Sequence, residues 1–281
     1  MPGKCDLEHV AKAICGMINF SYVKFIDAGA FKETYQVNDG TENHALKVFK
    51  PNNQSERTDR EIDAMRRVNN KNVARLIMVN SITYNSEKYL YLIEEYLSGG
   101  SLGTLLRGST LSKKEVFDLG KDMIGALEST YRERIVHRDI KPDNIMFRGN
   151  RSDAVLVDFG LVRDLEATSL TQAFHMRGPG TPLYSAPEQL NNEKALIDWR
   201  TDQFALGISL CRAILGIHPF DAGSPVKTVE KMASLDHIND TVKKHIIDQG
   251  FGVLIKMLEP YPIGRYRTPE MLMIEWNNME V

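Results

Sequence analysis

The run His137-Arg138-Asp139-Ile140-Lys141-Pro142-Asp143-Asn144 constrains this chain more than any other segment of its sequence. It places the carboxylate of Asp139, the ammonium of Lys141 and the amide of Asn144 close together, and Asp158-Phe159-Gly160 adds a further carboxylate soon afterwards. A carboxylate can accept the hydrogen of a hydroxyl, a lysine can stabilise a migrating phosphoryl group, and carboxylate and amide oxygens bind Mg²⁺. The segment therefore indicates phosphoryl transfer.

The order H-R-D-x-K-x-x-N, followed by D-F-G, resembles the signature of protein kinases. Lys141, two residues after Asp139, is typical of the serine/threonine branch. On these motifs the chain resembles the eukaryotic-like (Hanks-type) serine/threonine protein kinases, as a stand-alone catalytic domain. The resemblance implies an α+β, two-lobed, protein-kinase-like fold. Its small lobe would be an antiparallel β-sheet with one main helix, and its larger lobe would be mainly α-helical.

The resemblance extends over roughly residues 20 to 275. The expected parts are an N-terminal helical extension (1–19), the small lobe (20–95), a hinge (96–100) and the large lobe (101–281). Residues 7–18 repeat apolar side chains at helical spacing. This pattern favours a helix packed on the small lobe, and a dimerisation or partner helix is the alternative.

The resemblance implies a role for each charged or amide group of the signature. Asp139 would accept the hydrogen of the substrate hydroxyl, and Lys141 would stabilise the γ-phosphoryl group as it passes. Asn144 and Asp158 would chelate Mg²⁺ or Mn²⁺. The expected reaction is transfer of the ATP γ-phosphate to serine or threonine hydroxyls of protein substrates.

A second group of residues is expected to bind ATP between the lobes. Lys47 lies in an apolar, strand-like run from Ala45 to Phe49 and would hold the α/β-phosphates, while Glu61 lies in a helical pattern and would hold Lys47. Adenine would bond to the hinge backbone at Glu95 and Leu97. The full expected set is Gly29, Lys32, Val37, Ala45, Lys47, Glu95, Leu97, Ser101 and Met146. An ordinary place in the strand core is the alternative for Val37.

Downstream, Ala186-Pro187-Glu188 resembles the end of an activation segment. Arg265 is the expected ion-pair partner of Glu188, and Arg267 is the alternative. Thr181 is expected to bond to the catalytic aspartate and lysine, unless it is only a turn residue. The candidates for autophosphorylation in this segment are Thr168, Ser169 and Thr171.

The resemblance implies structural roles for two more residues. Asp202 lies in a helical stretch and is expected to steady the catalytic loop through backbone amides. His137 is expected to pack in a spine of side chains and to bond to the backbone, so it is not predicted to be a base. Its partners in the spine would be Met65, Leu76 and Phe159.

The loop expected to cover the phosphates departs from the family pattern G-x-G-x-x-G, because Asp27-Ala28-Gly29-Ala30-Phe31-Lys32 keeps only Gly29. Asp27 brings an unfavourable negative charge, which Lys32 could offset. We therefore expect nucleotide affinity to be weaker than usual, although not lost.

Glu94 is a second departure, since it precedes the hinge at a position that is usually apolar. A buried carboxylate needs a partner, and the nearest cation would be Lys47. Our hypothesis is that Glu94 competes with Glu61 for Lys47 and favours an inactive arrangement. A register slip of one residue, which would put Glu94 in solvent, is the alternative.

Composition is consistent with a globular protein, and it limits the classes of partner that we expect the protein to bind. Lysine plus arginine number 35 against 37 acids, so no basic surface suggests a nucleic acid partner. The three cysteines are widely spaced, which indicates free thiols, and no Cys or His pair has metal-ligand spacing. No apolar run reaches the length of a membrane span, so we expect a cytoplasmic protein without a membrane partner. The oligomeric state is left open.

Two other functions remain as alternatives to an active protein kinase. A pseudokinase scaffold would bind nucleotide and partner proteins, but it would have no need of the metal-binding carboxylate at Asp158. A small-molecule phosphotransferase of the aminoglycoside-kinase kind would share part of the catalytic loop. The segment from Gly180 to Glu188 speaks against that reading, because such a segment builds a groove for an extended polypeptide.

Overall fold

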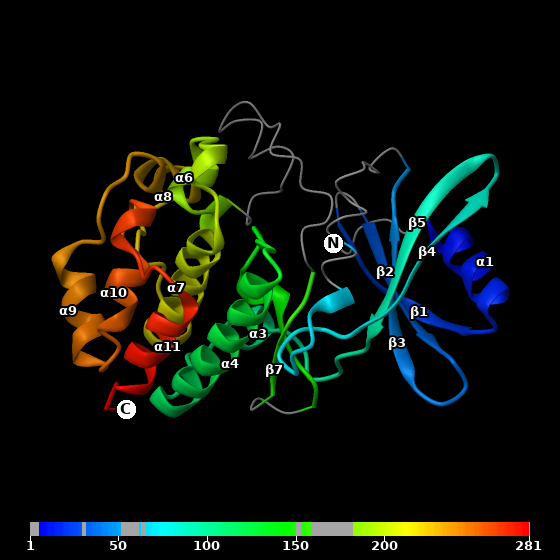
Figure 1. The fold of residues 1–281 in the computed structure, drawn as a ribbon, viewed down its shortest axis with the longest axis horizontal. Coiled ribbons are helices and arrows are strands. Elements are labelled where there is room, and N and C mark those ends of the chain that lie inside the picture. The colour runs from blue at the N-terminus through cyan, green and yellow to red at the C-terminus, as the bar shows by residue number, and fades with distance from the viewer. Residues whose placement is uncertain are drawn as a thin grey trace. The chain divides into compact units, whose positions relative to one another are not determined.

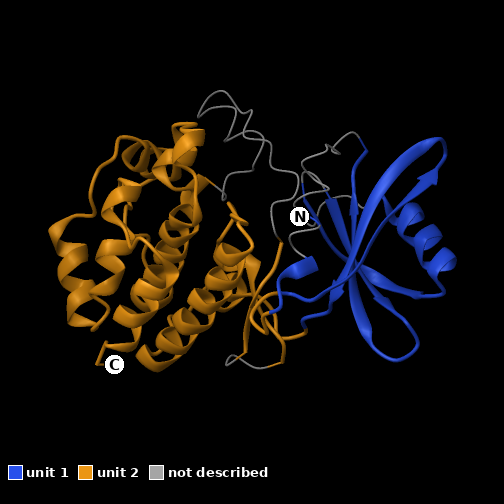
Figure 2. Cartoon of the chain, in the orientation of Figure 1, with its two compact units in different colours: residues 1–69, 74–97 blue, residues 70–73, 98–281 orange. Residues whose placement is uncertain are grey.

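The computed structural model describes residues 6–29, 32–51, 62, 66–149, 153–158 and 182–280. The chain divides into two compact units (Figure 2). Unit 1 comprises residues 1–69 and 74–97, and unit 2 comprises residues 70–73 and 98–281. Unit 1 is built around a β-sheet and unit 2 is mainly helical (Figure 1).

Unit 1 contains a five-stranded antiparallel sheet in the order β1-β2-β3-β5-β4. The strands are β1 (Ser21–Ala28), β2 (Lys32–Asn38), β3 (Asn43–Phe49), β4 (Leu76–Tyr84) and β5 (Glu87–Glu95). Neighbouring side chains on a strand point to opposite faces, so each central strand contributes to two surfaces. Tyr35 and Val37 of β2 occupy one face and are fully buried, while Thr34 and Gln36 occupy the other.

Helix α1 (Glu8–Ile18) covers the face of the sheet that carries Tyr35 and Val37 (Figure 1). The buried residues of this core cluster are Leu7, Val10, Ala11, Ile14, Cys15, Tyr35, Val37, Leu46, Val48, Tyr89, Tyr91 and Ile93. Of the two interpretations of residues 7–18, the structure shows the packed helix. The helix ends at Asn19, which adopts the left-handed conformation (φ 59°) that asparagine tolerates.

The start of α1 is held by a buried carboxylate from the sheet. Glu33, at the beginning of β2, accepts hydrogen bonds from the backbone N–H groups of Asp6 (2.9 Å) and Leu7 (3.0 Å) and from the hydroxyl of Tyr35. These bonds satisfy donors that a helix N-terminus leaves unpaired, and the negative charge suits the positive end of the helix dipole. Glu33 thus ties α1 to β2, the strand that follows the loop expected to cover the phosphates.

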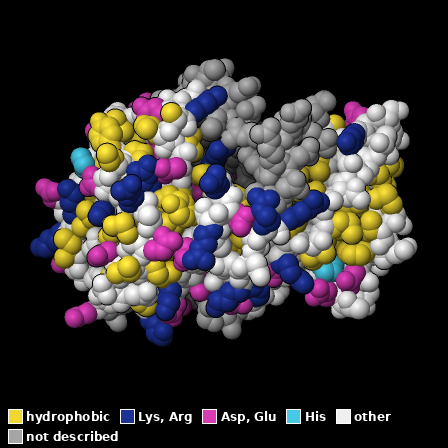
Figure 3. All heavy atoms as spheres, in the orientation of Figure 1, with side chains coloured by type: hydrophobic (Ala, Val, Ile, Leu, Met, Phe, Trp, Pro, Cys, Tyr) yellow, Lys and Arg dark blue, Asp and Glu magenta, His cyan; other side chains and the backbone are white. Residues whose placement is uncertain are grey.

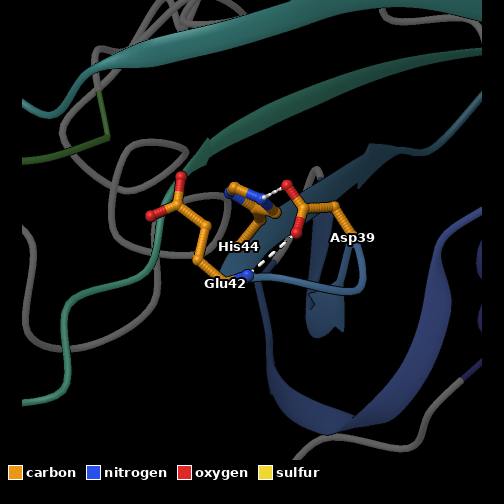
Figure 4. A group of neighbouring side chains, drawn as sticks. All are labelled: Asp39, Glu42 and His44. Atoms are coloured by element: carbon orange, nitrogen blue, oxygen red, sulfur yellow. Dashed lines mark hydrogen bonds and ion pairs between the residues drawn. The ribbon is translucent and has the colours of Figure 1, made fainter.

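The turn between β2 and β3 is closed by Asp39 (Figure 4). Its Oδ1 accepts hydrogen bonds from the backbone N–H groups of Thr41 and Glu42, both at 2.8 Å, and its Oδ2 bonds to His44 Nε2 at 2.9 Å. These bonds hold the pKa of the Asp39 carboxyl well below its usual range, and the bond from the Glu42 amide contributes most to that lowering. Asp39, Glu42 and His44 offer ligand atoms within 4.8 Å of one another, but the carboxylate of Asp39 already serves the turn.

Unit 2 is a helical assembly with a two-stranded sheet, β6 (Ile145–Phe147) and β7 (Ala154–Leu156). Its α-helices are α3 (Leu102–Leu105), α4 (Lys113–Arg132), α6 (Pro187–Leu190), α7 (Trp199–Leu215), α8 (Pro225–Ala233), α9 (Asp240–Asp248), α10 (Val253–Met257) and α11 (Pro269–Asn277). Short 3₁₀ turns span Pro142–Asn144, Pro182–Tyr184, Lys194–Leu196 and Pro262–Gly264. Helix α4 packs against both α7 and α11, and together they form the centre of this unit.

A sheet-rich unit and a mainly helical unit confirm the predicted α+β, two-lobed fold class. The exact boundaries of the hinge and the extension stay predictions. Within the described ranges, no helix is both long and apolar enough to cross a membrane. Cys15 and Cys211 are buried free thiols, and acidic and basic side chains are interspersed on the face drawn in Figure 3.

Candidate active site

The catalytic-loop residues of unit 2 converge on the carboxylate of Asp139. Lys141 Nζ lies 3.1 Å from Asp139 Oδ2. Asn144 Nδ2 donates to the backbone oxygen of Asp139 (2.8 Å) and to its Oδ2 (2.9 Å). The 3₁₀ turn Pro142–Asn144 brings these side chains together, since Asn144 N–H bonds back to the oxygen of Lys141 (2.9 Å). The predicted base and its cation are therefore adjacent.

Asp202 of α7 holds the start of this loop. Its two carboxylate oxygens accept the backbone N–H groups of His137 and Arg138, each at 2.7 Å. Burial raises the pKa of the Asp202 carboxyl to about 7, while the two amide hydrogen bonds oppose that rise. The two bonds fix consecutive amides and hold Arg138 in the left-handed region (φ 64°). The predicted steadying role of Asp202 is confirmed by these contacts.

The ring of His137 is bonded on both sides to the backbone. Its Nε2 donates to the oxygen of Val157 (2.9 Å), and its Nδ1 accepts the N–H of Asp139 (3.2 Å). The side chain is buried, and both ring nitrogens are used in hydrogen bonds to the backbone. This arrangement agrees with the prediction of a structural residue. Its expected spine partners Met65 and Phe159 lie outside the described residues.

The two predicted metal ligands flank the paired strands β6 and β7. Asn144 directly precedes β6, Asp158 lies two residues after the end of β7, and the N–H of Val157 bonds to the oxygen of Asn144 (3.0 Å). Asn144 donates from its Nδ2 to Asp139, so its Oδ1 takes no part in that contact. An amide oxygen and a carboxylate on neighbouring backbone segments are the donor set that Mg²⁺ prefers. These residues fit a magnesium ion.

Two predicted nucleotide contacts are neighbours in unit 2. Ser101 forms an antiparallel bridge with Met146, and Gly99 N–H bonds to the oxygen of Phe147 (2.8 Å). A Cβ on Gly99 would lie 2.6 Å from that same oxygen, so only glycine allows the segment this close to β6. Met146 and Ser101 are both partly exposed.

In unit 1, Lys47 and Glu94 form a buried ion pair. Lys47 Nζ donates to Glu94 Oε2, and the two residues are 5% and 4% exposed. Ala45 of β3 lies opposite Glu94 of β5, and Lys47 is two residues further along the strand, so Lys47 and Glu94 share one face of the sheet. The predicted contact is confirmed, and the alternative that placed Glu94 in solvent is wrong. Competition with Glu61 stays a prediction, because Glu61 lies outside the described residues.

Val37 requires a correction. It is fully buried in the core cluster under α1, whereas Ala45 is partly exposed on the opposite face, paired with Gln36. Because side chains alternate along β2, Val37 cannot share the face of Ala45 and Lys47. The alternative stated for Val37, a place in the strand core, is the one that the structure shows.

The remaining nucleotide candidates of unit 1 lie at strand ends. Gly29 N–H bonds to the oxygen of Lys32 (2.8 Å), and this bond spans the loop between β1 and β2. Glu95 N–H bonds to the oxygen of Arg75 (3.0 Å), and Leu97 is buried.

The phosphorylation candidates and the expected partner of the catalytic aspartate, which are Thr168, Ser169, Thr171 and Thr181, lie outside the described residues.

Glu188 and Arg265 form a second buried ion pair, in unit 2. Arg265 Nη1 and Nη2 donate to the two carboxylate oxygens at 2.7 and 3.0 Å. The expected partner is thereby confirmed and Arg267 is excluded from that role. Two further contacts were not predicted from the sequence. The Thr201 hydroxyl donates to the Glu188 carboxylate (2.8 Å), and Gln189 Nε2 donates to the backbone oxygen of Arg138 (3.1 Å). Their only signal was proximity to the motifs.

Comparison with known proteins agrees with this geometry. The family model "Protein kinase domain" matches residues 20–277. "Probable serine/threonine-protein kinase MARK-C" of Dictyostelium discoideum is 32% identical over 244 residues, which is 85% of this chain and 30% of the relative. "Probable serine/threonine-protein kinase PknB" of Lactococcus lactis is 27% identical over 270 residues, 91% of this chain and 41% of the relative.

The chain thus spans about a third of the length of these curated relatives. Among solved structures, Rad53 residues 1–466 in complex with AMP-PNP resembles the chain with a TM-score of 0.72 and 20% identity, over 94% of this chain and 68% of that one. At this identity the likeness concerns the fold. The family model covers nearly the whole chain, and the chain therefore belongs to the protein kinase domain family.

Proposed function

We propose that the protein is a cytoplasmic serine/threonine protein kinase that transfers the γ-phosphate of ATP to hydroxyls of protein substrates. The observation that carries this proposal is the convergence of Lys141 and Asn144 on the carboxylate of Asp139. Phosphoryl transfer depends on positioning and on charge stabilisation, and this loop supplies an oriented acceptor beside a cation. Autophosphorylation at Thr168, Ser169 or Thr171 is part of the proposal.

Each residue would have a separate task in the reaction. Asp139 would accept the hydrogen bond of the substrate hydroxyl and orient its oxygen, and Lys141 would stabilise the γ-phosphoryl group. Asn144 and Asp158 would hold Mg²⁺, which when bound neutralises charge on the phosphates. Lys47 would bind the phosphates from unit 1.

Incorporation of labelled γ-phosphate into the protein and into myelin basic protein tests the proposal. Wild type would be compared with Asp139→Asn and Asp158→Ala, in Mg²⁺ or Mn²⁺. We expect label in wild type only, and mapping of the phosphosites would identify the residue class. Nucleotide binding without label in wild type would favour the pseudokinase scaffold instead.

A further inference from the structure

The ion pair between Lys47 and Glu94 has an electrostatic consequence for ligand binding. Both side chains are almost fully buried, at 6% and 5% exposure, so water screens them little. They come from adjacent strands, β3 and β5, whose register is continuous from His44 to Val48. The contact is therefore built into the sheet and does not depend on a loop.

We propose that Glu94 is an internal counter-ion that masks the charge of Lys47 and so lowers the protein's preference for nucleotide phosphates over the bare nucleoside. This inference deepens the proposed function and rests on it, because it takes Lys47 as the residue that receives the phosphates. It assigns Glu94 a part in setting affinity, and it does not require Glu94 to touch the nucleotide.

The masking follows from charge. A lone buried ammonium attracts a polyphosphate strongly, because the local dielectric is low. A carboxylate in contact with that ammonium makes the pair neutral, and the long-range attraction falls. An ammonium has three N–H donors in all, so Lys47 can hydrogen-bond to a phosphate while it stays bonded to Glu94. Masking therefore weakens the phosphate contribution without abolishing it.

Glu94 differs in this respect from Glu33, a second buried glutamate among the residues of unit 1 that the structure describes. The carboxylate of Glu33 is satisfied by two backbone amides and a tyrosine hydroxyl, which are neutral donors. Glu94 instead bonds to a cation, on the opposite face of the sheet from the α1 core. Its charge therefore acts on Lys47.

Wild-type protein gives the first test. Dissociation constants for Mg·ATP and for adenosine would be measured by isothermal titration calorimetry at constant salt. Masking predicts that ATP binds no more than about tenfold more tightly than adenosine. A ratio of about a hundredfold or more would contradict it, and this measurement does not depend on how any variant folds.

Glu94→Gln gives the second test, with Glu87→Gln as the matched control. Glu87 lies at the other end of β5, is exposed, and accepts the hydroxyl of Tyr89 (2.6 Å). We expect Glu94→Gln to bind Mg·ATP about tenfold or more tightly than wild type and adenosine about equally. The control should change neither constant. Weaker ATP binding by Glu94→Gln would overturn the proposal, because it would make Glu94 a residue that positions Lys47.

A double-mutant cycle with Lys47→Met isolates the pair. If Glu94 acts through Lys47, Glu94→Gln changes ATP affinity in the wild-type background and leaves it unchanged in Lys47→Met. An equal gain in both backgrounds would overturn the proposal. All these experiments measure equilibrium binding. If the protein binds ATP as expected but transfers no phosphate, the result supports the masking and refutes the proposed function.

Discussion

Arg265 and Glu188 meet in a two-point ion pair although 77 residues separate them in the sequence. Both side chains are 0% exposed. The guanidinium also donates to the backbone oxygens of Glu259 (2.8 Å) and Pro260 (2.7 Å). The pair thus ties the end of the activation segment to the chain before α11, with each charge satisfied inside the protein.

Loss of this pair should be strongly destabilising. We expect Arg265→Ala to lower the free energy of unfolding by about 3 to 5 kcal/mol, because it leaves the Glu188 carboxylate buried without its cation. Urea denaturation measures the change. Lys114→Ala is the control, since Lys114 and Asp118 form an exposed pair on α4 (2.8 Å) that should contribute no more than about 0.5 kcal/mol. Similar losses in both variants would contradict this prediction.

Two glycines of α4 should respond oppositely to alanine. A Cβ on Gly120 would lie 2.0 Å from Trp276 of α11, whereas nothing lies within 4 Å of a Cβ on Gly125. We expect Gly120→Ala to destabilise the protein by about 1 to 3 kcal/mol through overpacking. Gly125→Ala should stabilise it by about 0.5 to 1 kcal/mol through helix propensity. Thermal unfolding measures the change in stability of each variant. A change in the same direction in both variants would contradict the prediction from packing.

Asp202→Asn should impair the catalytic loop. An asparagine keeps one acceptor oxygen, so its NH₂ group would face one of the N–H donors of His137 and Arg138. We expect a loss of about 1 to 3 kcal/mol in stability and a fall in kcat of about tenfold or more. Asp198→Asn is the control, because asparagine caps a helix as well as aspartate does and the lost ion pair with Arg200 is partly exposed and so contributes no more than about 1 kcal/mol. Unchanged kcat in Asp202→Asn would contradict the steadying role.

His218 should make unit 2 sensitive to acid. Its Nε2 donates to the oxygen of Leu183 (2.7 Å) and its Nδ1 accepts the N–H of Phe220 (3.1 Å), so the neutral ring is required. Burial lowers the pKa of His218 to about 4; the hydrogen bond to Leu183 opposes this change, the charge of Arg212 assists it, and Asp221 opposes it. Between pH 6.5 and 4 the unfolded chain binds the extra proton, so stability is complete above pH 6.5 and falls as the pH drops towards 4.

Denaturation at pH 7 and pH 4.5, for wild type and His218→Gln, measures this contribution. The wild type should lose up to about 3 kcal/mol more than the variant on acidification, with some reduction because the ring is partly exposed. Other titrating groups are common to both proteins and cancel in the comparison. Equal acid sensitivity would show that His218 does not titrate in this window.

The sequence by itself determined the residues of the catalytic loop and the fold class. Asp139, Lys141 and Asn144 lie in one short run, so a local 3₁₀ turn suffices to bring them together. The helical period of residues 7–18 likewise predicted α1, because an apolar stripe of that period must be covered. The predicted pairing of Glu188 with Arg265 also held, since the surrounding motifs constrained both partners.

Only the tertiary structure decided which face of a strand each side chain occupies. Val37 and Ala45 both suit a nucleotide pocket by residue type, but the register of β2 and β3 and the position of α1 put Val37 in the core. The capping of α1 by Glu33 joins residues more than 25 positions apart and leaves no local pattern. Strand register and the docking of α1 depend on packing between distant segments, and a one-residue slip would reverse every such assignment.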